Sequence, residues 1–193
     1  MRLKSLLAAT ALVLAAATAA LADGAVDKIM TASDKARLAN YGATRKEALA
    51  EANKGGDPKD LKVLNQVIAK PPASFQKFDM TGNWQCRTIK VGGLLPLVVY
   101  GWFKCRVTDD GSGWMLEKVS GSQRTKGRFY TEGDKRLIYL GSGYVDGDPV
   151  KPYGAGKETD QVGYAFLMGP KSWRIEFPAP YYESKLDILE FKR

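Results

Sequence analysis

After Phe78 the sequence consists of short strand-like runs that are separated by Gly, Asp and Pro residues. Short runs at regular spacing with such breaks are typical of an antiparallel sandwich or barrel. The candidate strands lie at residues 82–90, 97–108, 113–120, 124–132, 136–144, 161–168, 172–177 and 185–192. This pattern predicts a mainly β fold: a small, antiparallel, eight-stranded up-and-down barrel whose interior is filled by side chains or holds one small ligand. Glycines inside the runs fit strands that bend to close a barrel, namely Gly101, Gly127, Gly141, Gly143 and Gly163.

The segment before the strands is predicted to form two short α-helices. The first covers Thr31 to Asn53, where Ala, Lys, Glu, Arg and Leu dominate, and Gly55-Gly56 ends it. The second begins at Asp57-Pro58, an N-cap followed by proline at the first helical position, and ends before Pro71-Pro72. The second helix carries one apolar stripe, made of Leu61, Leu64, Val67 and Ile68. Two short helices with a single stripe cannot form a core alone, so we expect them to pack on the barrel. The expected organisation is a helical segment over 23–77 and a barrel over 78–193.

Residues 1–22 have the pattern of a secretory signal peptide: Arg2 and Lys4, an apolar run and the cleavage motif Ala20-Leu21-Ala22. The apolar run of about 15 residues is shorter than the roughly 20 that a membrane-spanning helix needs. No cysteine follows the predicted cleavage point, so we expect neither a lipid anchor nor a transmembrane anchor in the mature chain. The predicted location is therefore periplasmic or secreted.

Export changes how the two cysteines are interpreted, because an oxidising compartment favours a disulfide between Cys86 and Cys105. Both lie in candidate strands, 82–90 and 97–108. If these strands form a hairpin, the cysteines sit opposite one another and link it. A redox-active pair is more typically spaced as Cys-x-x-Cys, so a structural role is favoured.

The residues that the chain lacks exclude several kinds of chemistry. With no His and only two Cys, the sequence has no Ser-His-Asp triad, no Cys-His dyad and no imidazole, four-thiolate zinc or iron–sulfur site. We expect no metal and no cofactor. Glycosidase-type chemistry needs only two carboxylates, but the spacing singles out no pair among Asp146, Asp148, Glu158 and Asp160. The sequence therefore favours a non-enzymatic protein.

The chain is basic, with a formal charge of +8 that falls to +6 when Arg2 and Lys4 leave with the signal peptide. The excess is spread evenly over the helical segment and the barrel. A nucleic-acid partner would need clustering as well as sign, so none is expected.

Within two candidate strands, basic side chains occupy the face opposite the apolar one. This indicates a solvated outer face, as in a soluble barrel, and disfavours a transmembrane barrel with its uninterrupted apolar exterior. A basic stripe for an acidic partner or lipid head groups is the alternative. The residues concerned are Lys104, Arg106, Arg124, Lys126 and Arg128.

Three features are candidate sites. Leu94, Leu95, Pro96 and Leu97 belong to the most apolar stretch of the mature chain, which either contacts a ligand or partner or plugs one barrel end. The loop Gly154-Ala155-Gly156-Lys157 lacks the spacing and strand-to-helix setting of a P-loop and is interpreted as a surface loop. The tryptophans are possible pocket residues or, alternatively, core residues: Trp84, Trp102, Trp114 and Trp173.

The blocks Thr81–Arg87 and Gly92–Arg106, behind a signal peptide and an Ala-rich helical segment, resemble a family of small exported bacterial proteins known only as a domain of unknown function. The family implies no activity. Gly82-Asn83-Trp84 is also similar to the Gly-x-Trp of calycin-type barrels, which include lipocalins and inhibitors of bacterial secreted metalloproteases. Those inhibitors carry one barrel disulfide, comparable with Cys86 and Cys105, but have no long helical segment before the barrel.

We therefore expect an exported, non-enzymatic binding protein whose barrel contacts a small apolar ligand or an envelope protein. The alternatives are an inhibitor of a secreted protease and a carboxylate-based hydrolase of envelope glycan. The sequence does not determine the oligomeric state.

Overall fold

The computed structural model describes residues 23–193; the predicted signal peptide, residues 1–22, lies outside them. The helices are α1 (Asp23–Ile29), α2 (Ala32–Ala39), α3 (Tyr41–Gly55) and α4 (Pro58–Ala69). The strands are β1 (Gly82–Gly93), β2 (Leu97–Val99), β3 (Phe103–Asp109), β4 (Trp114–Lys118), β5 (Gln123–Gly133), β6 (Arg136–Val145), β7 (Asp160–Gly169), β8 (Ser172–Pro178) and β9 (Ser184–Lys192). Among the described residues, no helix is both long and apolar enough to span a lipid bilayer.

The strands form a closed, antiparallel, eight-stranded barrel with one extra strand, which confirms the predicted fold class. Neighbouring strands in the sequence pair in turn from β3 to β9, and β1 closes the barrel by pairing with both β3 and β9. The short strand β2 extends the sheet beside the second half of β1. The predicted strand boundaries agree with the observed ones to within three residues at each end, except in one run.

That run, predicted as one strand over 97–108, is divided into β2 and β3 by Tyr100–Trp102. Both parts pair with β1, but the register changes by one residue between the pairs Ile89↔Val99 and Cys86↔Phe103. The extra residue lies at the unpaired stretch around Gly101, where a glycine allows the chain to bend. This interruption separates the part of the run that the helices cover from the part that closes the barrel.

The barrel interior is filled by aromatic and aliphatic side chains. Trp173 stacks on Phe191 and meets the rings of Trp84 and Phe129 edge to face. The ring of Tyr139 lies over the backbone of β5 and β6, where a Cβ atom on Gly127 or Gly141 would collide with it. These glycines therefore make room for the Tyr139 ring as well as for strand curvature.

Within residues 23–193, four helices precede the barrel, in place of the two that the sequence predicted. The predicted helix over Thr31–Asn53 is broken at Asn40, which caps α2 with near-zero ψ, and α1 was not predicted at all. The second predicted helix forms as α4, with the Asp57 side chain accepting a hydrogen bond from the Lys59 amide, 2.7 Å away. Asn favours caps over helix interiors, which accounts for the break.

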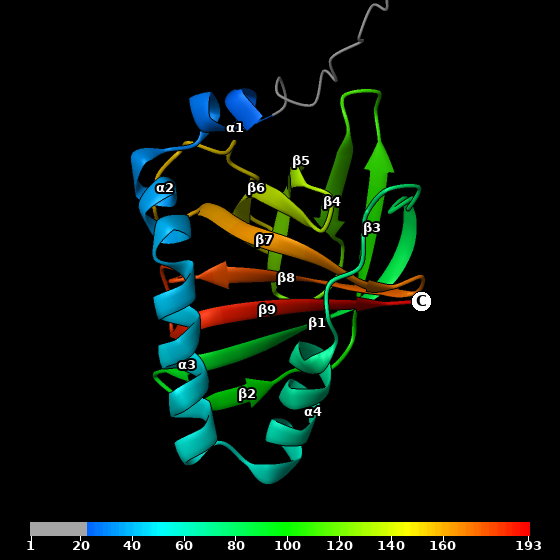
Figure 1. The fold of residues 1–193 in the computed structure, drawn as a ribbon. Coiled ribbons are helices and arrows are strands. Elements are labelled where there is room, and N and C mark those ends of the chain that lie inside the picture. The colour runs from blue at the N-terminus through cyan, green and yellow to red at the C-terminus, as the bar shows by residue number, and fades with distance from the viewer. Residues whose placement is uncertain (1–22) are drawn as a thin grey trace, which may run out of the picture.

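The helices pack on the outer face of the barrel wall (Figure 1). α3 crosses β8, β9 and β1, and with α4 it covers an apolar cluster that includes Ile89 and Ile188. α1 and α2 cover a second cluster on β6 and β7, which includes Leu140 and Val162. The outer faces of β3, β4 and β5 are mostly without helical cover, so the wall has one packed side and one solvated side.

The two ends of the barrel differ. At the Phe75 end, residues 71–81 cross from β7 to β1: Ala73 bridges Leu167, and Phe75 joins the interior cluster. At the Leu94 end, four loops meet, made of residues 94–96, 119–122, 146–159 and 179–183. The Phe75 end is thus plugged by apolar side chains. The Leu94 end is formed by loops, and charged side chains lie inside it.

Candidate functional site at the Leu94 end of the barrel

The predicted contact residues divide into two exposed and two packed side chains. Leu94 and Leu95 form the tip of the β1–β2 loop, with 79% and 58% of their surfaces exposed. Pro96 is half-buried and lies where a Cβ atom on Gly55 would touch it. Leu97 is 7% exposed and belongs to the cluster beneath α3 and α4. The predicted contact at Leu97 is therefore corrected: it is a core residue of the helix–barrel interface, and neither exposed leucine plugs the barrel.

The β8–β9 loop places two more exposed apolar side chains beside this tip. The Leu94 amide donates a hydrogen bond to the Glu183 carbonyl, 2.8 Å away, which joins the two loops. Tyr181 and Tyr182 are exposed, and their rings meet edge to face at 4.7 Å. We call Leu94, Leu95, Tyr181 and Tyr182 the apolar rim. The sequence analysis found half of it, because Tyr181 and Tyr182 lie between the predicted strands 172–177 and 185–192 and outside the contiguous apolar run.

Inside the same end, the barrel carries charged side chains. Lys90 shares the inward face of β1 with Trp84 and Cys86, and Lys118 follows the interior residue Leu116 by two positions on β4. Both lysines are buried. On β9, Asp187 precedes the interior residue Leu189 by two positions and is partly buried. The barrel interior is thus apolar toward Phe75 and charged toward Leu94.

A hydroxyl chain lies between these two halves of the interior. The Thr125 hydroxyl donates its one proton to the Gln161 side-chain oxygen at 2.5 Å. The Tyr139 hydroxyl, 2.6 Å from the Thr125 hydroxyl, must therefore donate to Thr125. The Gln161 side chain fills the space where a Cβ atom on Gly143 would lie. Three strands, β5, β6 and β7, therefore each contribute a neutral polar group to the charged half.

Lys90 has an ionic partner. Its ammonium group donates to the Glu183 carboxylate at 2.6 Å, and Asp187 lies directly opposite it on β9. Burial lowers the pKa of Lys90, but the charges of Asp187 and Glu183 outweigh this effect and hold the pKa above its usual range. Burial raises the pKa of Asp187.

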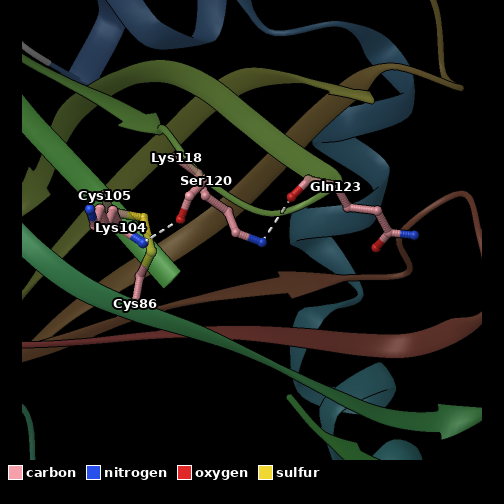
Figure 2. The surroundings of a disulfide bond; sticks show 6 residues. All are labelled: Cys86, Lys104, Cys105, Lys118, Ser120 and Gln123. Carbon is pink, nitrogen blue, oxygen red and sulfur yellow. Dashed lines mark hydrogen bonds between the residues drawn. A yellow bond between two sulfur atoms is a disulfide. The ribbon is translucent and has the colours of Figure 1, made fainter. Parts of the chain in front are cut away.

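Lys118 has no such partner. Figure 2 shows its side chain near the disulfide, with the ammonium group directed at the Gln123 carbonyl oxygen, 2.8 Å away. The ammonium also lies 4.4 Å from the centre of the Phe103 ring. Within residues 26–193, no carboxylate comes within 4 Å of it. Burial lowers the pKa of Lys118 from 10.5 to about 8.

The disulfide between Cys86 and Cys105 forms as predicted and joins β1 to β3, with the Cα atoms 5.9 Å apart. The two cysteines are not directly opposite, however. Cys86 faces Phe103 and Cys105 faces Trp84, so the bond runs diagonally across the strand pair. Both sulfurs lie in the interior cluster, which supports a structural role.

The tryptophans do not line a common pocket. Trp84 and Trp173 are buried in the barrel core, and Trp114 packs against its edge. Trp102 lies beside Arg87 and Lys192, whose cations are 4.5 and 4.1 Å from its ring centre. Of the two alternatives, the core interpretation fits Trp84 and Trp173.

The basic residues on β3 and β5 lie on the solvated face, and most of them are paired. Glu117 on β4 lies between Arg106 and Lys126, at 3.7 and 3.6 Å. Arg124 pairs with Asp146 at 2.8 Å, and Arg128 pairs with Asp110. Lys104 is exposed, and its backbone amide donates to the Ser120 hydroxyl. The charges on this face are therefore largely compensated, which disfavours a basic stripe for an acidic partner.

The Gly154–Lys157 segment is a surface loop, and it binds its own chain. The amides of Gly154 and Gly156 donate to the Asp160 carboxylate at 2.9 and 3.4 Å. A surface hollow of about 270 Å³ lies beside this loop, and one of about 20 Å³ lies between α4 and β8; neither is inside the barrel. In the described part of the chain, no group of three or more Cys, Asp or Glu side chains is placed to hold a metal ion.

A second buried charge cluster lies on the outer face of β8, beneath α3. Glu176 accepts hydrogen bonds from Arg174 Nε at 2.6 Å, Arg45 Nε at 2.8 Å and the Tyr41 hydroxyl at 2.7 Å. Two of the three donors, Tyr41 and Arg45, come from α3, so this cluster fixes α3 on the barrel.

The sequence analysis missed Lys90, Lys118 and Asp187. A signal was present, because each lies in phase with apolar residues of its own strand: Lys90 with Trp84 and Cys86, for example. Charged residues at inward positions contradict the usual alternation and therefore mark positions worth examining.

Comparison with known proteins gave one match. The sequence profile of a family described as "Domain of unknown function (DUF4893)" matches residues 27–191, from α1 to β9. No curated protein and no solved structure matched the chain. The predicted resemblance to a family known only as a domain of unknown function is confirmed, and the closed barrel is consistent with the weaker calycin-type resemblance. The chain belongs to the DUF4893 family of domains of unknown function.

Proposed function

We propose that this protein is an exported, non-enzymatic binding protein that contacts an envelope protein through the apolar rim. One observation carries the proposal: Leu94 is 79% exposed at a tip that is hydrogen-bonded to the neighbouring tyrosine loop. Contiguous exposed apolar side chains often mark a contact surface. Tyrosines are also enriched where proteins meet, because they add contact area at low entropic cost.

The packed interior favours a protein over a small apolar ligand. Trp173, Tyr139 and Phe191 are fully buried. Trp173 stacks on Phe191, and the Phe129 ring contacts both Trp173 and Tyr139, so aromatic rings fill the apolar half of the barrel. The hollow beside Gly154–Lys157 and the one between α4 and β8 both lie outside the barrel. A wholly apolar ligand would have to enter the charged half, where it would offer no hydrogen-bond acceptor to the buried ammonium groups of Lys90 and Lys118.

The disulfide supports an oxidising location, and with the signal-peptide pattern of residues 1–22 it favours the periplasm or secretion. Protease inhibition would be one form of contact through the rim. Glycan hydrolysis is disfavoured, because the carboxylates Asp187 and Glu176 lie on opposite faces of the barrel wall and cannot flank one bond.

The experiment is site-specific photocrosslinking in the cell envelope, with benzoylphenylalanine at position 95 and, as a control, at position 29. Ile29 is also exposed but lies on α1. We expect a discrete adduct with one envelope protein at position 95 only. The purified partner should then bind the Leu94→Ala/Leu95→Ala variant at least tenfold more weakly, with the melting temperature barely changed. An equal affinity of the variant, or a large loss of melting temperature with binding intact, contradicts the proposal.

Native mass spectrometry of the protein, purified gently from its own envelope, tests the alternative that the barrel carries a small apolar ligand. We expect no wholly apolar molecule to remain bound under native conditions. A reproducible additional mass of such a molecule, lost on denaturation, would contradict contact through the rim and support a barrel that carries a small apolar ligand.

A further inference from the structure

The starting point is an asymmetry between the two buried ammonium groups at the Leu94 end. Lys90 receives a carboxylate from Glu183, whose side chain is exposed and reaches in from the β8–β9 loop. Lys118 is 5% exposed, and its ammonium group lies beside the Gln123 carbonyl oxygen and the Phe103 ring. Among the described residues, it has no ion pair with a carboxylate. An ammonium has three donors, and one hydrogen bond to Gln123 leaves the others without an assigned partner.

The Lys118 ammonium keeps its charge at neutral pH. Although burial lowers its pKa to about 8, a group with that pKa is still about nine-tenths protonated at pH 7. A buried charge without an ionic partner is costly in the free protein. A cost of this kind is typical of a site whose partner arrives from outside.

The surrounding charges define what that partner is. The groups that influence Lys118 are Asp187, which favours its charged form, and Lys90 and Arg124, which oppose it. Arg124 is paired with Asp146, and Lys90 with Glu183. The Leu94 end of the interior therefore has two buried ammonium groups, one carboxylate at its edge and the partly buried Asp187, whose pKa burial raises. An excess of at most one positive charge suits a monoanion and not a doubly charged phosphate.

We infer that the charged half of the barrel holds a binding site for a single carboxylate group, with Lys118 as its ionic partner. Glu183 shows that a carboxylate entering from the loops reaches a lysine in this interior. The Phe103 ring beside Lys118 and the apolar rim outside favour a carboxylate on an apolar body. The inference concerns the interior site alone and does not depend on a protein partner at the rim.

Two probes distinguish the sources of such a group, a free amphipathic acid and a peptide carboxyl terminus. The first is sodium decanoate, compared with decanol and decyl phosphate. The second is the tripeptide Ala-Leu-Leu with a free carboxyl terminus, compared with its amide. Binding is measured by isothermal titration calorimetry on the disulfide-intact protein. In parallel, NMR of reductively ¹³C-methylated protein follows the pKa of Lys118.

We expect one carboxylate probe to bind, its uncharged counterpart to bind at least tenfold more weakly, and the pKa of Lys118 to rise in the complex. Lys118→Met should weaken binding at least tenfold while remaining folded, because methionine keeps the length and loses the charge. Lys104→Met, on the exposed face of the neighbouring strand, is the matched control and should bind as the wild type does. Lys118→Gln provides a second variant if methionine disturbs the fold.

Decanoate binding identifies a free acid as the ligand class, and binding of the peptide acid alone identifies a carboxyl terminus. The inference is overturned if neither carboxylate binds, if Lys118→Met binds as tightly as the wild type, or if the pKa of Lys118 is unchanged in the complex. None of these results depends on crosslinking at position 95, so the inference and the proposed function can fail separately.

Discussion

Lys90 and Asp187 are direct cross-strand neighbours on β1 and β9, yet the Lys90 ammonium donates to Glu183, 2.6 Å away in the β8–β9 loop. The loop is thereby tied to the barrel interior from one side. From the other side it is tied to the β1–β2 tip, because the Glu183 carbonyl accepts from the Leu94 amide. Glu183 also has a positive φ of 68°, which a non-glycine residue adopts only when its surroundings hold it there.

Replacing Glu183 with glutamine should loosen the rim. Lys90 loses its ionic partner at the loop, and the free energy of unfolding should fall by about 1 kcal/mol, as for a half-exposed charged hydrogen bond. Hydrogen exchange of the Leu94 amide should become faster. Chemical denaturation and exchange NMR measure both effects. Asp148→Asn, in the exposed loop 146–159, is the control, and an equal loss in the two variants would show that Glu183 has no special role.

Lys118→Met should raise the free energy of unfolding at pH 7, because it removes a buried charge that lacks an ionic partner. The pH dependence gives a sharper test. The pKa of Lys118 is about 8 in the folded protein and near 10.5 in the unfolded chain, so the unfolded chain binds more protons between these values. The wild type should therefore gain up to about 3 kcal/mol relative to Lys118→Met as the pH rises from 8 to 10.5.

Denaturation midpoints of the wild type, Lys118→Met and Lys104→Met at several pH values check this prediction. Lys104 is exposed on β3, so its replacement should leave the slope unchanged. Parallel curves for the wild type and Lys118→Met would mean that Lys118 has an ordinary pKa in the folded protein.

The strands were predictable from the sequence because short strand-like runs are separated by turns that use Gly, Asp and Pro. The division at Gly101 was not, because alternation shows which side chains share a face but does not reveal a one-residue change in register. The helix break at Asn40 likewise depends on how α2 and α3 lie on different strands of the wall. Asn40 and Gly101 are residues that permit a break, but tertiary packing decides which of the permitted positions are used.

The site was predicted only in part. Leu94 and Leu95 were found because a contiguous apolar run is visible in one sequence, but whether each member is exposed depends on α3 and α4, which cover Leu97. Lys90, Lys118 and Asp187 were missed because lysines and aspartates in strands are expected to face solvent. Their common location becomes evident only when the register places β1, β4 and β9 around one interior.

Removing the disulfide should cost stability without removing the fold. The bond closes a loop with a sequence separation of 19, which corresponds to about 3 kcal/mol in the chain-entropy account. The double variant Cys86→Ala/Cys105→Ala should lose about that amount in urea denaturation and keep its β-sheet circular dichroism, because the surrounding aromatic cluster remains. Reduction of the wild type should match the variant, and the variant itself should not respond to reductant. An unfolded variant would contradict this.

Glu176→Gln tests how α3 is fixed on the barrel. Glu176 is fully buried and is the common acceptor for Arg174, Arg45 and Tyr41. Removing its charge leaves the buried Arg174 guanidinium without an ionic partner, so the free energy of unfolding should fall by about 3–5 kcal/mol. Tyr41→Phe removes one hydrogen bond from the same carboxylate and should cost only about 1 kcal/mol. Equal losses in the two variants would contradict a role for the charge.

Acid titration distinguishes what the charge of Glu176 contributes to stability from what the packing of its side chain contributes. Burial raises the pKa of this carboxyl, but the charges of Arg174 and Arg45 outweigh burial and hold the pKa below its usual range. A carboxyl with a lowered folded-state pKa contributes stability above its unfolded-state pKa and loses that contribution as the pH falls through the folded-state value. The difference in stability between the wild type and Glu176→Gln should therefore be constant near neutrality and shrink below about pH 4. A difference that persists unchanged in acid would assign the loss to packing of the amide and not to the ion pairs beneath α3.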